Sequence, residues 1–538
     1  MKTWIQNHQN NKRTCRNWIA IIISLFLLIT LQLPHQLRAV ENGTEDPGIF
    51  RVGLEANYTP FNWSQSNNKN SACAINNSPG EYVNGYDVWM ANKIASALGL
   101  KLEIIKLEWD GLVPALNSGK IDAIIAGMSP TEERKQAIDF SNTYYTSDLV
   151  MVVQKGSIYE KATSIQDFKN AKVTAQINTF HYEVLKQIQG LVPETALDTF
   201  PTMIASLLSG KLDAYVSERP GAIAATSANP SLTYVEFTPE NGFETKIEDT
   251  SIAIGLRKGS PLLNDVNEAL AKISEAERQK AMETMISYTV DTSDKKVGFW
   301  ATSVDILEEY WPLFLRGAGV TLFIAVISTL VGFIIGLLVQ IVREIPLNDK
   351  NNFTKVVLAI IQFLLNAYVE IFRGTPMMVQ AMLIFYGSKL FLNIDMTSIG
   401  AALLIVSINT GAYMSEVVKG GISSISKGQF EACKSIGLNH WQSMIHVILP
   451  QTIKTILPTI GNEFVVNIKD SSVLNVISVT ELFFVTKSVA GTNLKIFHTY
   501  LLTAIIYFVL TFAATRLINW IGKKTGQTKD FSLQSASA

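Results

Sequence analysis

The sequence is poor in cysteine, in histidine and in charge of either sign. Its three cysteines (Cys15, Cys73 and Cys433) and six histidines are spread over 538 residues. These numbers do not support a disulfide framework, and no Cys/His spacing typical of zinc occurs, so we predict no metal site. Lys plus Arg (45) nearly balance Asp plus Glu (46). With no basic tract present, nothing favours nucleic acid as a partner.

Motifs of catalysis are also missing. The sequence has no GxxxxGK[ST] phosphate-binding loop, no nucleophile–base motif and no cofactor fingerprint. We therefore predict no catalytic residue and no cofactor.

Hydrophobic residues are abundant and unevenly distributed. They make up 48% of the chain, against 17% charged residues, and the long apolar runs lie in the C-terminal part. A run of about 20 apolar residues is long enough to cross a bilayer as a helix. We predict about five membrane helices within 313–522, followed by a cytoplasmic tail at 523–538; the expected spans are 317–341, 359–391, 399–418, 453–479 and 497–521.

The N-terminus has the pattern of a targeting segment. Basic residues at positions 2, 12, 13 and 16 precede an apolar run over 18–33, which is typical of an export signal. Residues 1–39 are predicted to be a signal peptide or an N-terminal anchor, and both alternatives remain open. In either case, export of the following segment is expected.

Residues 45–293 alternate short apolar strands with helical patterns, which predicts an α/β domain with parallel sheets. An internal repeat refines this prediction. ALNSGKIDAIIAG (115–127) is echoed by SLLSGKLDAYVSE (206–218). In each copy Gly ends a helix and Asp-Ala opens a strand. Two similar lobes facing one another across a cleft are therefore expected, joined by a short linker (294–312) to the membrane domain.

Ligands of open α/β sheets bind beyond the carboxyl ends of the strands. The two repeated strands end at GMSPTEER and SERP, so both sequences are predicted to face the cleft. Arg134 offers a planar fork for a carboxylate, to which Ser129 and the backbone at Gly127 add donors. Glu218 is suited to accept bonds from an ammonium group, and Thr179 lies where another strand meets a helix. Tyr58 and Trp109 are predicted to enclose the ligand side chain.

These segments carry a family resemblance. EANYTPF, GYDVWMANKIA, WDGLVPAL, AGMSPTEERK and DFSNTYY, in this order, resemble the periplasmic-type binding proteins for polar amino acids. The resemblance implies that Arg134, Ser129 and Thr179 hold the α-carboxylate and Glu218 the α-ammonium. Glu55 stands where family members that bind basic amino acids place an acidic residue. Arginine, lysine or histidine is therefore the expected ligand, with glutamine or another neutral polar amino acid as the alternative.

The polar stretch 427–451 (KGQFEACKSIGLNHWQSMIHVILPQ) lies between apolar spans. Apolar residues at helical spacing predict two short helices, separated at Gly437, with the second stopped by Pro450. Glu431, Ala432, Gly437 and Pro450 match the EAA loop (428–450) of ABC importer permeases, whose membrane domain is MetI-like. RGTP (373–376) and NTGAYMSEVVKGGI (409–422) add to this resemblance, which is to polar amino-acid uptake permeases.

The resemblance to permeases implies partners and a topology. A separate ABC ATPase, two copies per transporter, would grip the EAA loop, and the permease would pair as a homodimer, with a hetero-pair as the alternative. In a bacterial cell membrane the binding domain would be extracellular or periplasmic and the C-terminus cytoplasmic. By parity the loop 393–397 shares the side of the binding domain, whereas 427–451 lies opposite. An amino-acid-gated channel or sensor is the rival class, but no selectivity-filter sequence or output domain is present.

Overall fold

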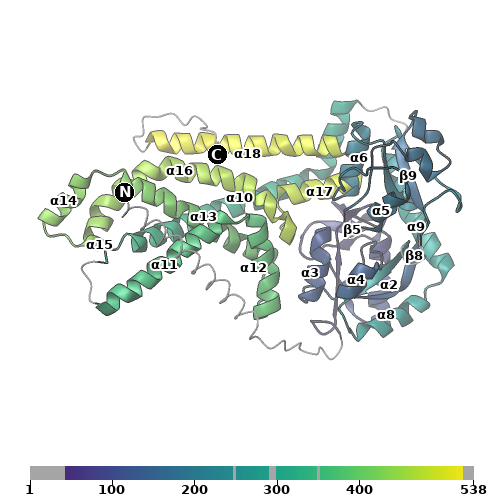
Figure 1. Cartoon of the computed structure of the whole chain (residues 1–538), viewed down its shortest axis with the longest axis horizontal. Coiled ribbons are helices and arrows are strands. Elements are labelled where there is room, and N and C mark those ends of the chain that lie inside the picture. The colour runs from purple at the N-terminus through teal and green to yellow at the C-terminus, as the bar shows by residue number, and fades with distance from the viewer. Residues whose placement is uncertain (1–42, 178, 246–249, 290–297, 348–351, 525–538) are drawn as a thin grey trace, which may run out of the picture.

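A computed structural model describes residues 43–177, 179–245, 250–289, 298–347 and 352–524. The leader (1–39) and almost all of the tail (523–538) lie outside the described residues. An α/β domain occupies one end of the molecule, and long helices extend away from it (Figure 1). The predicted fold class, a two-lobed α/β binding domain followed by an all-α membrane domain, is confirmed.

The first lobe is built on a five-stranded sheet with the order β6-β1-β7-β13-β8. β1 pairs in parallel with both β6 and β7, whereas β13 runs antiparallel to β7 and β8. The strands are β1 (Ile49–Leu54), β6 (Lys101–Lys106), β7 (Ala123–Ile124), β8 (Asp139–Thr146) and β13 (Ser251–Leu256), and the helices are α2 (Tyr86–Leu98), α3 (Leu112–Asn117), α4 (Glu132–Ala137), α8 (Leu262–Ala271) and α9 (Glu275–Thr289).

The second lobe has a four-stranded sheet with the order β10-β11-β9-β12, and a further sheet, β2-β3-β5-β4, lies beside the first lobe. The chain passes between the lobes twice, from β8 to β9 and from β12 to β13. The remaining elements are β2 (Asn57–Tyr58), β3 (Asn62–Gln65), β4 (Cys73–Ala74), β5 (Tyr82–Asn84), β9 (Leu149–Gln154), β10 (Val173–Thr174), β11 (Ala214–Glu218), β12 (Leu232–Val235), α5 (Phe180–Glu183), α6 (Phe200–Leu208) and α7 (Arg219–Ala228).

The repeat predicted from sequence marks one helix-to-strand turn in each lobe. Gly119 after α3 and Gly210 after α6 adopt φ values of +75° and +71°, a conformation that glycine reaches without steric cost. Asp122 then accepts a hydrogen bond from the backbone N of Arg51 at 3.0 Å. In the other lobe Asp213 accepts one from the N of Lys172 at 2.8 Å. The Asp of each copy thus ties its strand to the neighbouring one.

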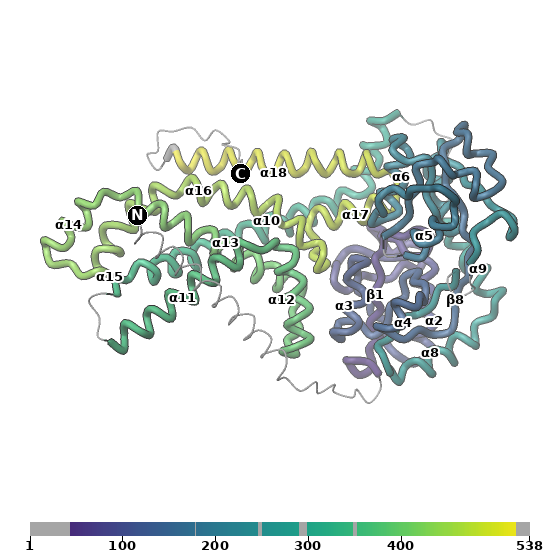
Figure 2. Tube along the Cα trace, in the orientation of Figure 1, coloured from purple at the N-terminus to yellow at the C-terminus, as the bar shows by residue number. Residues whose placement is uncertain are grey.

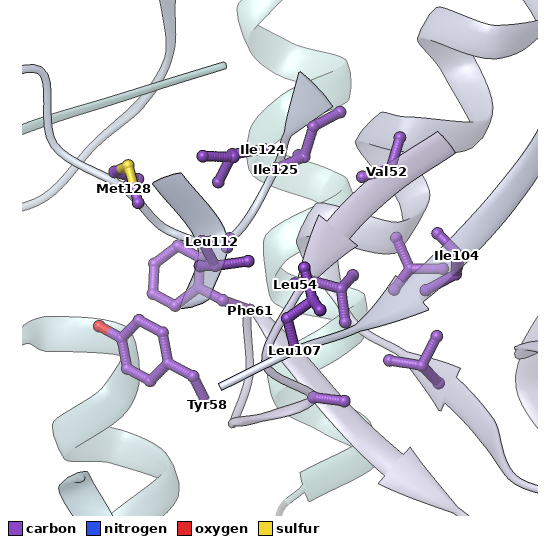
Figure 3. Packing of buried hydrophobic residues seen from close by; sticks show 14 of the residues in the cluster. Val52, Leu54, Tyr58, Phe61, Ile104, Leu107, Leu112, Ile124, Ile125 and Met128 are labelled. Carbon is purple, nitrogen blue, oxygen red and sulfur yellow. The ribbon is translucent and has the colours of Figure 1, made fainter. Parts of the chain in front are cut away.

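The core of the first lobe surrounds β1. Val52 and Leu54 are fully buried, and Figure 3 shows them beside Ile104 of β6 and Ile124 of β7. The same apolar cluster continues across the domain boundary to Phe385 and other residues of the membrane domain. The two domains are therefore packed together and not merely connected by the chain.

The membrane domain contains four helices long and apolar enough to span a bilayer, or up to five if a bent pair counts as one span. This count applies to the described residues. The helices are α10 (Phe299–Arg343), α11 (Asn352–Gly374), α12 (Met377–Leu392), α13 (Ser398–Ser423), α14 (Lys427–Ser435), α15 (His440–Ser443), the π-helical η6 (Met444–Ile448), α16 (Leu449–Asp470), η7 (Ser471–Ile477), α17 (Leu482–Asn493) and α18 (Ile496–Lys524).

Small residues let the central helices approach closely. A Cβ added at Gly332 of α10 would lie 2.7 Å from the Cβ of Thr410 on α13, and one at Gly336 would lie 2.5 Å from the Cβ of Met414. Glycines four residues apart on one helix face are a common packing device in membranes. Between these helices and α16, the Asn467 amide donates to Thr329 Oγ1 at 2.8 Å.

Two sequence predictions about helix limits differ from the structure, and the expected linker forms part of a helix. The expected span 359–391 is broken at Thr375 and Pro376 into α11 and α12, because proline disfavours a helical residue before it. The expected linker 294–312 is helical from Phe299 onward, as the start of α10. Pro450 does not stop a helix; it lies in the first turn of α16, where a missing N–H is tolerated.

The membrane domain meets the α/β domain through the α12–α13 loop and through α17. Lys120 Nζ lies 2.8 Å from Asp395 Oδ1 in that loop, which places the loop beside the binding domain as the parity argument predicts. Lys487 on α17 pairs with Glu108. The 427–451 segment, with α14 and α15, lies at the opposite end of the molecule (Figure 2).

We expect Asp122→Ala to destabilise the α/β domain by about 3 kcal/mol, because it removes the buried carboxylate that pairs with both Arg51 and Arg257 and leaves Arg51 only the exposed Asp46. Asp122 is fully buried and accepts from both Arg51 Nε, at 3.3 Å, and Arg257, at 3.4 Å. The measurement is the urea midpoint of the α/β domain in the purified full chain. Asp213→Ala is the matched control, with an expected loss of about 1 kcal/mol for one hydrogen bond. Equal losses for the two variants would contradict the prediction.

Candidate functional site

One cavity between the two lobes, with about 310 Å³ of empty space, brings the candidate residues together. Every ligand-binding residue singled out from the sequence lines it, and their roles in binding remain predictions. Four further residues complete the lining. The predicted set is Glu55, Tyr58, Trp109, Gly127, Ser129, Arg134, Thr179 and Glu218, and the additional residues are Gln176, Phe180, His181 and Phe200.

Aromatic rings from the two lobes meet beside this cavity. The ring of Tyr58, at the end of β2, stacks on Phe200 of α6 with a centroid distance of 4.6 Å and an angle of 5°. The centre of the Tyr58 ring also lies 4.9 Å from that of Phe61, and Figure 3 shows these two rings next to one another. Since Tyr58 belongs to the first lobe and Phe200 to the second, the stack exists only while the lobes are closed.

Glu218 crosses the cleft from the end of β11. It accepts a hydrogen bond from the Tyr58 hydroxyl, and its Oε1 lies 2.9 Å from His181 Nε2. Burial acts to raise the pKa of this carboxyl, but the positive charge of His181 and the two hydrogen bonds outweigh it and hold the pKa below its usual value. Glu218 is therefore a charged acceptor that reaches the opposite lobe.

Glu55, directly after β1, is 4% exposed. Burial, assisted by the negative charge of Glu108 and opposed by Lys487, raises its pKa from 4.5 to about 8. When the Asn57 amide nitrogen faces it, that nitrogen lies 3.1 Å and 3.2 Å from the two carboxylate oxygens. In the described part of the chain, no lysine, arginine or histidine forms an ion pair with Glu55.

Arg134 comes from α4, whose N-cap Thr131 accepts from the Arg134 backbone N. Its guanidinium lies 5.2 Å from the centre of the Trp109 ring and donates to the Ser129 carbonyl at 2.9 Å. Burial lowers its pKa to about 10, so the group remains positive at neutral pH. A positive fork held against an aromatic face is well suited to a carboxylate.

Two predicted donors are engaged within the protein. The Thr179 hydroxyl donates to the Gln176 carbonyl at 2.7 Å. The backbone N–H of Gly127 points to the Tyr144 hydroxyl at 3.3 Å, so in this structure it is not directed at a ligand. Gly127 adopts φ +65°, and an added Cβ would lie 2.9 Å from the Tyr58 ring. Its role here is to allow the close approach of Tyr58.

Sequence reasoning missed His181 and Phe200. His181 lies two residues after Thr179, at the same strand-to-helix junction that the sequence had indicated, and is 7% exposed. Its closeness to Thr179 in the sequence is the feature that could have marked His181 as a candidate for the cleft. Phe200 is the first residue of α6. An apolar residue at the start of a helix is common, so the sequence does not mark Phe200 as part of a cleft.

The predicted docking segment presents apolar side chains outward at the far end of the membrane domain. Ile436 is 75% exposed, Trp441 47% and Ile445 54%. Gly437 adopts φ +80° between α14 and α15, which confirms the predicted break between two short helices. Glu431, Ala432 and Pro450 are all exposed as well. The apolar face predicted from spacing is thus turned away from the protein, except for Ile448, which is buried.

Two family models match the chain. The family described as bacterial extracellular solute-binding proteins, family 3, matches residues 50–286. The family described as binding-protein-dependent transport system inner membrane component matches residues 356–527. The first match covers the α/β domain with its cavity, and the second covers the helices from α11 to α18.

Relatives of known designation are similar to part of the chain. A probable amino-acid ABC transporter permease, YckA of Bacillus subtilis, is 33% identical over 40% of this chain and 90% of its own length. The glutamine transport system permease GlnP of Escherichia coli is 30% identical over 40% of this chain and 93% of its own length. A substrate-binding protein from Streptococcus pneumoniae, crystallised with L-arginine, is 29% identical over 45% of this chain and 94% of its own length, with a TM-score of 0.39.

The buried carboxyl of Glu55 predicts a dependence of stability on pH. Its pKa in the folded chain, about 8, lies above the ordinary 4.5, so between these values the folded state binds more protons than the unfolded state. The contribution of Glu55 to the free energy of unfolding is therefore most favourable at low pH and is lost as the pH rises toward 8. Glu55→Gln removes this loss. We expect the variant to equal the ligand-free wild type near pH 5 and to exceed it by several kcal/mol above pH 8, on the scale of about 1.4 kcal/mol per tenfold change in proton affinity.

Unfolding midpoints of the ligand-free full chain at a series of pH values measure this difference. Glu283→Gln, on an exposed position of α9, is the matched control and should follow the wild type throughout. A gap between Glu55→Gln and wild type that is constant with pH would show that Glu55 is not the titrating group.

Proposed function

Because the chain belongs to the amino-acid ABC transporter permeases, with a family 3 solute-binding domain ahead of the permease, we propose that it captures cationic amino acids and passes them into its own membrane domain. The cleft between the lobes is the capture site. Arginine, lysine and histidine are the proposed ligands, and uptake is driven by ATP hydrolysis on a separate subunit.

The observation that carries the choice of ligand is Glu55. A carboxylate in an apolar cleft is costly unless a positive group lies against it. The described residues supply no ion-pair partner to Glu55, and burial raises its pKa to about 8. A ligand with a positive side chain would provide the missing charge, lower the pKa of Glu55 and hold the carboxylate in its ionised form.

The main-chain groups of the ligand match the rest of the lining. We assign the α-carboxylate to Arg134, with the Ser129 hydroxyl and, once it turns from the Gln176 carbonyl, the Thr179 hydroxyl as further donors. The α-ammonium goes to Glu218, which already accepts from His181 and Tyr58. The ligand side chain would pass between Tyr58 and Trp109 toward Glu55.

Glutamine, or another neutral polar amino acid, is the second candidate. The observation in its favour is the similarity of the membrane domain to permeases named for glutamine, including GlnM of Bacillus subtilis at 32% identity over 97% of that protein. A protonated Glu55, with its pKa near 8, could donate to an amide carbonyl. The two candidates therefore differ in the charge state of Glu55 in the complex.

The exposed apolar side chains at α14 and α15 support the proposed ATPase contact. Ile436 and Trp441 form no buried core, and an apolar protrusion of this kind suits insertion into a groove on another protein. We propose that the ATPase grips the segment around Glu431, Ala432, Gly437 and Pro450.

Since such ATPases act in pairs, two permease domains are needed, most simply as a homodimer. The α/β domain then lies outside the bacterial cell membrane, and α14, α15 and the C-terminus lie in the cytoplasm.

We expect the purified full chain to bind arginine or lysine more tightly than glutamine, and Glu55→Gln to abolish that preference. A hydrogen bond to a charged group contributes about 1.5–3 kcal/mol, so the cationic ligands should lose roughly tenfold to a hundredfold in affinity while glutamine changes little. Isothermal titration with arginine, lysine, histidine, glutamine and glutamate is the measurement.

Glu283→Gln is again the control for this titration, because it removes a carboxyl of the same domain far from the cleft. Tightest binding of glutamine, unaffected by Glu55→Gln, would favour the second candidate. Binding of none of these amino acids would refute the assignment of the cleft altogether.

We expect Gly437→Ala to reduce ligand-stimulated ATP hydrolysis several-fold when the chain is reconstituted with its ATPase. Ala at a φ of +80° costs about 1–2 kcal/mol, which disfavours the turn that orients α14 against α15. Gly428→Ala, in the same docking segment but with room for a Cβ, is the matched control and should retain full hydrolysis. Equal activities of the two variants would contradict the docking role.

A further inference from the structure

The end of α17 lies against the cleft of the α/β domain. Residues 491–495, from Gly491 to Lys495, comprise the end of this membrane-domain helix and the two residues after it. They contact both lobes of the α/β domain, a contact that no pattern in the sequence predicts. We call this segment the interlobe wedge.

The wedge meets the first lobe through close backbone approaches. A Cβ added to Gly491 would lie 2.5 Å from the Cβ of Asn57, so only glycine fits at this position. The Thr59 hydroxyl donates to the Gly491 carbonyl at 3.2 Å, and the Thr492 hydroxyl donates to the Ser64 carbonyl at 2.6 Å. Asn57 and Thr59 flank Tyr58 of the ligand cavity.

The wedge meets the second lobe at the end of α7. The Asn229 amide donates to the Leu494 carbonyl at 3.4 Å, and Lys495 Nζ donates to the Ala228 carbonyl. Leu494 is 5% exposed and adopts φ +54°, an unfavourable conformation for a branched side chain. Such strain persists only where the surrounding contacts hold it.

Leu494 also borders a second cavity, of about 240 Å³, that shares a wall with the ligand cavity. The shared residues are Tyr58 and Phe200, which line both. These are the two rings that stack across the lobes at 4.6 Å. Opening the lobes would separate the rings and, at the same time, draw the two sets of wedge contacts apart.

From this arrangement we propose that the interlobe wedge holds the α/β domain closed, so that withdrawal of α17 is required before the lobes can open and release the ligand. A segment that contacts both lobes only when they are closed must favour the closed state, and closure must in turn favour docking. The proposal deepens the proposed function, since it concerns release from the same cleft. It makes Leu494 and Thr492 positioning residues that act on ligand affinity without touching the ligand.

The test is arginine binding to the full chain in lipid nanodiscs, by isothermal titration. Leu494→Ala should weaken arginine binding by at least about thirtyfold, as expected for the loss of about 2 kcal/mol or more from a well-packed leucine that stabilises only the closed state. Thr492→Val, nearly identical in shape, should weaken it less and in the same direction. Leu338→Ala, at a 58% exposed site on α10, is the matched control. Unchanged or tighter binding in the wedge variants would overturn the proposal.

A second measurement separates failure of the wedge from failure of the ligand assignment. Hydrogen exchange of the ligand-free full chain should show that Leu494→Ala lowers the protection of residues 57–64 in the first lobe and of 225–229 in the second together. Loss of protection in one lobe only, or in neither, would refute the two-lobe contact. If the wild type binds no amino acid, the proposed function fails, but this experiment still decides the role of the wedge.

Discussion

A carboxylate buried without a cationic partner is the constraint around which the cleft is built. Glu218 lies 2.9 Å from His181 Nε2 and accepts a hydrogen bond from Tyr58, whereas Glu55 has an amide neighbour and a pKa of about 8. The folded chain therefore carries a local cost that a positively charged group placed against Glu55 would remove. Functional sites commonly retain such costs, because the group that destabilises the empty protein provides the selectivity of the occupied one.

The basic residues of the membrane domain that face the α/β domain depend on the docked arrangement. Lys487 and Lys495 lie at the end of the membrane domain that meets the α/β domain; if this end is extracellular, as proposed, positive residues are usually scarce there. In the structure Lys487 pairs with Glu108, and Lys495 donates to the Ala228 carbonyl. In the opposite sense, Lys106 of β6 in the α/β domain donates to the Ser488 hydroxyl of α17 in the membrane domain. Docking thus uses hydrogen bonds and ion pairs beside the apolar contact that continues from the core of the first lobe to Phe385.

The lobes and most of the cavity could be predicted because they depend on local chemistry. A glycine at the end of each repeated helix and an aspartate before each strand placed Gly127, Ser129 and Glu218 at strand ends, and the structure brings them together. The role of His181 could not be predicted from the sequence, because it depends on contact with Glu218. These two residues are far apart in the sequence and meet only in the folded chain. The helix limits failed at Pro376 and Pro450, where the effect of proline depends on whether the helix is beginning or ending. The contacts of residues 491–495 are set entirely by how two domains pack, and no local pattern encodes them.

Covalent connection of the α/β and membrane domains changes how strong their mutual contact has to be. A separate binding protein must find its permease by diffusion, and its capture depends on the concentration of each. Within one chain the second domain is always near, at an effective concentration that reaches the millimolar range for short connections. Contacts that would be too weak to hold two free proteins together can therefore keep these domains docked for most of the time. They can also break fast enough for each transport cycle, so turnover is not limited by the dissociation of a tight complex.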